Sequence, residues 1–357
     1  AGADHPPAAA SGAEASGGEG VDPPPIPEAA SSFQGSLLAL DGASPYAVGR
    51  GTQTWVLLKR RLYDHAKDRT KLARSLALKA TIGLLVGVIW INSGRDESYK
   101  AIFPTTGALF LVVNNSVMDT LFETVLQFPL QRALLEREYM NGTYALGSYY
   151  AALQISNLLL CSLSALLLAT PVYGLVGLSL EPARVAVFVA TVVLMSLIGS
   201  SLGVAVGALT SDIDSARGAI VPTLVPLLIF SGYLIPFGQI PAFFKWAYYA
   251  SFFQYSFGIL SINELEGRNF TQDCPLELAE EAAYDLIHAA MPGVPLPPLP
   301  NVTCSGVDYL AEAGLWPIAY GGLPGYFGIL AGYLVAVLIL AYVVLARRLS
   351  GGVRSVG

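Results

Sequence analysis

The chain has 357 residues and a formal net charge of −6, and 54% of its residues are hydrophobic while only 13% are charged. Soluble domains usually carry about 25% charged residues, so this chain has too few charges to coat a globular surface in water. We therefore expect lipid to cover part of the surface. The acidic balance, without a basic and aromatic cluster, argues against a nucleic-acid partner.

The first 35 residues are rich in Ala, Gly, Pro and Ser and contain no apolar stretch that could serve as a signal peptide. Such a composition cannot bury enough surface to offset the loss of chain entropy on folding. We predict a disordered linker over residues 1–50, a membrane domain over 51–349 and a cytoplasmic tail over 350–357. The chain is expected to be a piece of a longer protein.

Apolar, mostly charge-poor intervals of about 20 residues, the length that crosses the hydrocarbon core, predict six transmembrane helices. The predicted spans lie near 76–94, 101–125, 148–176, 183–209 and 217–237, and within 313–346. In the first span, Lys79 is expected to extend its ammonium group toward the interface. The fold class is therefore an all-α membrane protein.

The aromatic-rich segment 240–262 is ambiguous. As a seventh span it would place the chain ends on opposite sides of the membrane. Its aromatic density and the internal Lys245 favour a pair of short interfacial or re-entrant helices instead.

Lys and Arg are concentrated in the N-terminal flank, the loop 126–147, the turn 210–217 and the tail. The positive-inside rule then places both termini in the cytoplasm and makes residues 238–324 an outside loop. That loop contains the acceptor sequons of Asn269 and Asn301, which predict glycosylation. It also contains Cys274 and Cys304, which an oxidising compartment would allow to pair.

Residues 52–71 place Trp55, Leu58 and Leu62 on one helical face surrounded by basic residues, which predicts a helix on the inner membrane surface. The helix either anchors the first span only or also offers a contact for a motor domain. The loop 131–147 is expected to be helical until Asn141 and Gly142 end it. It is either a solvated turn or a rigid element that a nucleotide-driven partner pushes.

Polar residues in the second span need partners in lipid. Asn114 and Asn115 serve either as links between helices or as a substrate lining. For Asp119 and Glu123, one turn apart near the inner surface, ion pairing is favoured over a proton relay. In the fifth span, Pro222 and Pro226 predict a bend, either a common membrane kink or a moving gate.

The chain contains no phosphate-binding G-x-x-x-x-G-K-[ST] loop, and its three histidines are scattered. We therefore expect no catalytic residue, no metal site and no cofactor within this chain.

Six short pieces, taken in order, resemble the membrane domain of the G subfamily of ABC exporters, the group of White, sterol and multidrug transporters. The pieces are WVLLKRRL, GALFLVVNNSV, EREYMNGTYALGSYY, FSGYLIP, INELEGRNF and TCSGVDYL. The resemblance covers residues from about 52 to 349. It implies a dimer of half-transporters, each with an N-terminal nucleotide-binding domain that holds ATP and Mg²⁺ and lies outside this chain.

The resemblance also assigns roles to residues. Substrate-cavity positions, at the interface between the two halves, correspond to Asn115, Met118, Val221, Val225 and Leu228. Tyr233 and Leu234 match a pair of leucines that closes an upper gate, and the tyrosine departs from that pattern. Glu138, with Arg137, matches the loop that couples to the nucleotide-binding domain. Cys274 and Cys304 match an internal disulfide, and because the loop has no third cysteine, no covalent link between subunits is expected.

The favoured hypothesis is a multi-pass exporter of lipids, sterols or amphipathic small molecules, in the plasma membrane or a membrane of the secretory system, that works by alternating access. One alternative is a non-transporting or accessory scaffold subunit. The other is an ion-coupled carrier or channel that uses Asp119 and Glu123.

Overall fold

Five helices in the described part of the chain are long and apolar enough to cross a membrane. They are α3 (Arg69–Ile89), α4 (Ile102–Met140), α5 (Leu146–Val172), α6 (Pro182–Leu209) and α12 (Leu323–Arg354). The predicted fifth span corresponds to α7 (Ile213–Ile229), which has 17 residues and contains Pro222 and Pro226. The predicted helical membrane fold is confirmed, and the count of six spans stays a prediction.

The computed structural model describes residues 46, 48–210, 212–272, 274, 304–312, 314–315 and 321–354. All of these except Tyr46 belong to one compact unit, residues 48–357. Most of the predicted linker over residues 1–50, the sequon at Asn301 and the end of the tail lie outside the described residues.

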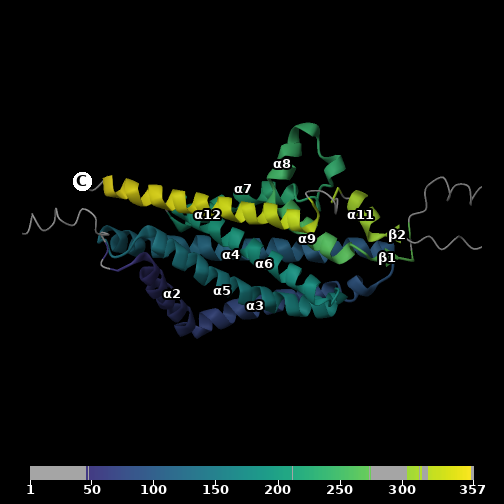
Figure 1. The fold of residues 1–357 in the computed structure, drawn as a ribbon, viewed down its shortest axis with the longest axis horizontal. Coiled ribbons are helices and arrows are strands. Elements are labelled where there is room, and N and C mark those ends of the chain that lie inside the picture. Colours follow the sequence, from purple (N-terminus) through teal and green to yellow (C-terminus); the bar gives the residue numbers. More distant parts are fainter. Residues whose placement is uncertain are drawn as a thin grey trace, which may run out of the picture. The chain divides into compact units, whose positions relative to one another are not determined.

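Helix α4 lies at the centre of the fold and packs most extensively on α6 (Figure 1). Glycines make this contact close. A Cβ at Gly199 would lie 2.5 Å from the Thr120 hydroxyl oxygen and 2.6 Å from the Val117 carbonyl oxygen, and Gly203 fits against Thr124 in the same way. Small residues at such crossings let two helix backbones approach in a membrane.

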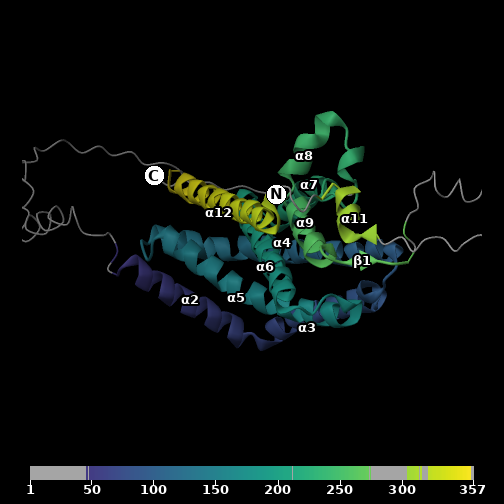
Figure 2. The ribbon, with the colours of Figure 1, turned by 45° about the vertical axis from the view of Figure 1, so that its right-hand side comes forward.

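The N-terminal helices form an elbow against α5, visible in Figures 1 and 2. Helix α2 (Arg50–Lys67) ends at Asp68, whose carboxylate accepts a hydrogen bond from the Lys71 amide and caps α3. On α2, Leu58 is buried against the protein whereas Trp55 is exposed. The predicted helix is therefore present, but Leu58 contacts the protein while Trp55 faces outward. The location of the helix on the membrane surface stays a prediction.

The loop between α4 and α5 has the form that the sequence predicts. Helix α4 continues to Met140, and Gly142 adopts a left-handed conformation (φ +65°) that lets the chain turn back into α5. Helix α4 therefore runs for 39 residues without a break, across the predicted span and beyond it.

Two short helices occupy the ambiguous segment, as predicted. Helix α8 (Lys245–Ala250) and helix α9 (Phe252–Leu265) are separated at Ser251, and both are too short to span a bilayer. Three other single-turn helices lie between the long ones. η1 (Ser93–Arg95) and η2 (Tyr99–Ala101) lie between α3 and α4, and η3 (Tyr173–Gly177) lies between α5 and α6. Two more lead into α8: η4 (Phe237–Gln239) and η5 (Ala242–Phe244).

The segment after α9 forms a small cross-linked unit. Strand β1 (Asn269–Phe270) pairs antiparallel with β2 (Cys304–Ser305), which leads into α11 (Gly306–Glu312). The predicted disulfide between Cys274 and Cys304 is present. These elements lie at one end of the fold, and the start of α2 and the end of α12 lie at the other (Figure 2).

We predict that Gly199→Ala destabilises the protein by about 1–3 kcal/mol, because the new methyl group meets the α4 backbone. Gly332→Ala in α12 is the matched control, since nothing lies within 4 Å of its Cβ position. Thermal unfolding of the detergent-solubilised protein measures both. Equal melting temperatures for the two variants would contradict the close packing of α4 on α6.

Candidate functional site

Two amides in the middle of α4 have unsatisfied oxygens. The side-chain carbonyl oxygens of Asn114 and Asn115 are buried and accept no hydrogen bond from any described residue. A buried acceptor left without a donor costs about 1–3 kcal/mol. Among the described residues of one copy, neither side-chain oxygen links α4 to another helix, and the choice between helix association and substrate lining stays open.

Helix α7 packs beside this part of α4. Its inner face buries Ile220 and Leu224, while Val221 on the outer face is 58% exposed and Val225 is half-buried. Met118 and Leu228, from the two helices, pack against the same hydrophobic core. The structure thus brings the five predicted cavity residues to two adjacent helices, with α7 presenting an uncovered apolar stripe.

The two predicted gate residues differ in environment. The Tyr233 ring stacks on Phe110 at 4.6 Å between centroids and on Phe103 at 5.8 Å. Its hydroxyl lies against Gly107, where a Cβ would be only 2.7 Å away. Leu234 is 51% exposed. The tyrosine is therefore held by its own copy, and only the leucine is free to meet another surface.

Glu138 joins three elements at the end of α4. One carboxylate oxygen accepts a hydrogen bond from Arg60 of α2 at 3.1 Å, and the other accepts one from the Tyr144 hydroxyl at 2.8 Å. Burial, together with this bond to Glu138, raises the pKa of Tyr144, so the phenol keeps its proton and donates at neutral pH. Arg137 is exposed beside this joint.

A second set of hydrogen bonds joins α2 to the start of α5. The Arg61 guanidinium donates to the Tyr149 hydroxyl at 2.8 Å, and the Gln53 side chain accepts from the Ala145 amide at 3.0 Å. Sequence reasoning missed these α2 partners, because it considered the helix only as a membrane-surface anchor or a contact for a motor domain. No local sequence signal marks Gln53 or Arg61 as a contact with α5.

The two acidic residues of the second span have separate partners. Asp119 forms an ion pair with Lys79 of α3, and Glu123 accepts a hydrogen bond from Gln127 at 2.9 Å. Ion pairing, favoured from the sequence, is thus confirmed for Asp119. The expectation that Lys79 extends to the interface is wrong: its side chain is 7% exposed, because pairing within the protein offsets the cost of burying the charge.

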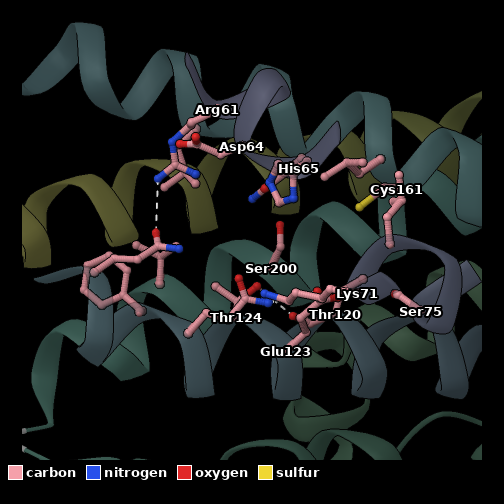
Figure 3. A pocket seen from close by; sticks show the side chains of 18 of the residues that line it. Arg61, Asp64, His65, Lys71, Ser75, Thr120, Glu123, Thr124, Cys161 and Ser200 are labelled. Carbon is pink, nitrogen blue, oxygen red and sulfur yellow. Dashed lines mark hydrogen bonds between the residues drawn. The ribbon is translucent and has the colours of Figure 1, made fainter. Parts of the chain in front are cut away.

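A cavity of about 360 Å³ lies within this one copy, between α2 and α6 (Figure 3). It is lined by residues of α2, α3, α4, α5 and α6, and not by the five predicted cavity residues. Among the residues that the structure describes, no group of three His, Cys, Asp or Glu side chains is arranged to hold a metal ion.

Comparison with known proteins places these features in a family. Residues 52–265 match the family model described as ABC-2 type transporter. ABC transporter G family member 7 of Arabidopsis thaliana is 27% identical over 61% of this chain and 30% of its own length. ABC transporter G family member 22 of Dictyostelium discoideum is 29% identical over 67% of this chain and 40% of its own length.

A third relative is the broad substrate specificity ATP-binding cassette transporter ABCG2 of Sus scrofa, 24% identical over 73% of this chain and 37% of its own length. The matched part of the chain therefore spans less than half the length of each of these three relatives. The family model covers more than half of the chain, so the chain belongs to the ABC-2 type transporter family, as a multi-pass membrane domain of the G-family kind.

Proposed function

We propose that the chain is the transmembrane subunit of an ATP-driven exporter of lipids, sterols or amphipathic small molecules. The observation that carries this proposal is the pair of unsatisfied amide oxygens of Asn114 and Asn115 beside the uncovered stripe of α7. A cavity with a few polar groups in an apolar lining suits a weakly polar, amphipathic cargo.

A second half-transporter is needed to complete this site. Within one copy, Val221 and Leu234 face outward, so Asn115, Met118, Val225 and Leu228 form only one wall. Subunits related by a two-fold axis present the same patch to each other, and the two walls would then enclose the cargo. In this arrangement Leu234 meets its counterpart at the gate, while Tyr233 supports it from behind.

ATP and Mg²⁺ would bind a nucleotide-binding domain that precedes this chain in the full protein. The resemblance and the name of the ABCG2 relative, an ATP-binding cassette transporter, support this. Closure of that domain would push the turn after α4. The joint formed by Glu138, Arg60 and Tyr144 would pass the displacement to α4, and alternating access requires such a link between two states.

The topology belongs to the same proposal. Both termini are cytoplasmic, residues 238–324 lie outside, and the membrane is the plasma membrane or one of the secretory system. The exposure of Asn269 in β1 supports its glycosylation, and Asn301 is the second acceptor. The domain division is a linker over 1–50, the membrane domain over 51–349 and a tail over 350–357.

The partners found for the acidic residues do not favour an ion-coupled carrier. A proton relay needs carboxylates that exchange protons with one another, whereas Asp119 is neutralised by Lys79 and Glu123 is bonded within its own helix. Purified full-length protein tests the remaining alternative. Substrate-stimulated ATPase supports an exporter, and flat ATPase supports an accessory scaffold.

We predict that Asn115→Leu weakens the apparent transport affinity about fivefold, the effect of losing one hydrogen bond of about 1 kcal/mol to cargo. Because the amide oxygen has no described donor, melting temperature should stay the same or rise. Ser116→Ala is the control, since its hydroxyl bonds the Val112 carbonyl of its own helix. A fall in melting temperature with unchanged transport affinity would instead assign Asn115 to helix association.

We predict that Glu138→Gln lowers the number of molecules transported per ATP about fivefold or more, the range of a typical coupling energy. ATP hydrolysis should continue, because the variant loses only the charged joint to α2. Glu136→Gln is a matched control on the same helix, since Glu136 pairs with Arg132 one turn away and contacts no other element through that bond. Equal coupling in both variants would remove Glu138 from the transmission path.

A further inference from the structure

The cavity inside the single copy is not the cargo site of the proposed transport cycle, although Arg60, Glu138 and Tyr144 of the coupling joint line part of it. It lies beneath the elbow of α2 and α3 and is closed on the other side by α4, α5 and α6. Figure 3 shows His65 of α2 and Ser200 of α6 pointing into one space, with Glu123 and Thr124 of α4 beside it. Its volume of about 360 Å³ falls within the range of small-ligand sites.

Two cations around the cavity are neutralised within the protein, and the Arg61 guanidinium keeps its charge but is held by neutral groups. Arg60 is paired with Glu138, and Lys79 is paired with Asp119. The Arg61 guanidinium lies over the Tyr149 ring at 5.1 Å and donates to its hydroxyl. Because these three side chains are held by other residues of the protein, fewer charged groups remain to bind a ligand.

The remaining groups carry both signs. The Lys71 ammonium group forms no ion pair with any described residue. Glu123 uses one carboxylate oxygen for the hydrogen bond from Gln127, and its other oxygen is not part of that bond. His65 also lines the cavity, and its pKa is lowered first by burial and then by the charges of Arg61 and Lys71, against the opposing effect of Glu123 and Asp64. His65 is therefore neutral at neutral pH and offers a ring N–H as a donor.

The cavity has apolar side chains in its lining beside the charged ones. Leu72, Leu76 and Leu160 line it. The neighbouring surfaces of α3 and α5 expose Leu78 and Leu159, which suits contact with acyl chains. A ligand that places a polar end inside and an apolar end along these helices matches this distribution.

We propose that this cavity binds the headgroup of a phosphatidylethanolamine-type lipid from the leaflet next to α2, with the phosphate at Lys71 and His65 and the primary ammonium at Glu123. A purely anionic headgroup would meet the carboxylates of Glu123 and Asp64, and a purely cationic ligand would meet Lys71 and Arg61. A headgroup with a negative and a positive charge can pair with the cations through one and with the carboxylates through the other.

The lining also distinguishes a primary ammonium from choline. Quaternary ammonium groups are recognised by the faces of free aromatic rings. Here the Tyr149 ring is stacked on Tyr144 at 5.8 Å and carries the Arg61 guanidinium, so it is not available as a cage. A carboxylate such as Glu123 instead pairs with an ammonium group that has N–H donors.

Lipid retention by the full-length protein tests the proposal. The protein is reconstituted in nanodiscs with equal amounts of phosphatidylethanolamine, phosphatidylcholine and phosphatidylglycerol, then partly delipidated, and the bound lipids are counted by native mass spectrometry. We expect phosphatidylethanolamine to be retained preferentially. Glu123→Gln should reduce its preference over phosphatidylcholine roughly fivefold, the loss of one partly exposed charge contact, and Lys71→Gln should lower retention of all three.

Two controls separate binding from folding. Lys71→Arg keeps the cation and should restore retention, and Lys59→Gln removes an exposed cation of α2 that does not line the cavity, so it should change nothing. Lipid counts that are identical in all variants overturn the proposal. Retention of the three lipids in equal proportions by the unaltered protein also overturns it, because the cavity would then not recognise the ethanolamine headgroup.

Discussion

Hydrocarbon cannot hydrogen-bond to polar groups, and this constraint determines the rest of the structure. Backbone groups are satisfied within long helices, and three hydroxyl side chains of α4 are satisfied in the same way: Ser116, Thr120 and Thr124 each donate to a carbonyl oxygen four residues earlier. The charges of Lys79 and Asp119 neutralise each other across two helices. The side-chain oxygens of Asn114 and Asn115, in contrast, are buried without a described partner, as are polar atoms of Gln154, Gln254 and several serines.

Helix α4 connects the features on which the proposed function depends. It carries Gly107, which accommodates the Tyr233 ring near one end, the two amides in its middle and the Glu138 joint near the other end. Its close contact with α6 through Gly199 and Gly203 makes it part of a rigid pair. A displacement at the joint therefore acts on a single continuous helix and not on a chain of flexible loops.

Much of the fold follows from local sequence signals. Apolar intervals mark the long helices because lipid selects composition directly, and Asn141 with Gly142 marks the end of α4 because a helix needs a residue that tolerates a left-handed turn. The break at Ser251 and the shortness of α8 and α9 agree with the aromatic density of that segment. The start of α3 at Arg69, earlier than the predicted span at 76, has its own signal in the cap provided by Asp68.

The pairing of side chains across helices could not be read from the sequence. Lys79 and Asp119 are 40 positions apart, and nothing local specifies that they meet. The same holds for Arg60 and Glu138, for the Tyr233 ring against Phe110, and for the cavity under the α2–α3 elbow, which five helices build together. The predicted cavity residues share two helices as expected, but the second wall that would enclose a cargo requires another copy.

The central claim is that the membrane separates the α2 end of this fold from the end that holds α9, β1 and β2. Cysteines introduced singly as Asn269→Cys and Lys59→Cys test it directly, since Cys274 and Cys304 are joined and Cys161 is buried. With a membrane-impermeant maleimide, Asn269→Cys should be labelled in intact cells and Lys59→Cys only after permeabilisation. Labelling of both positions from the same side would contradict the account.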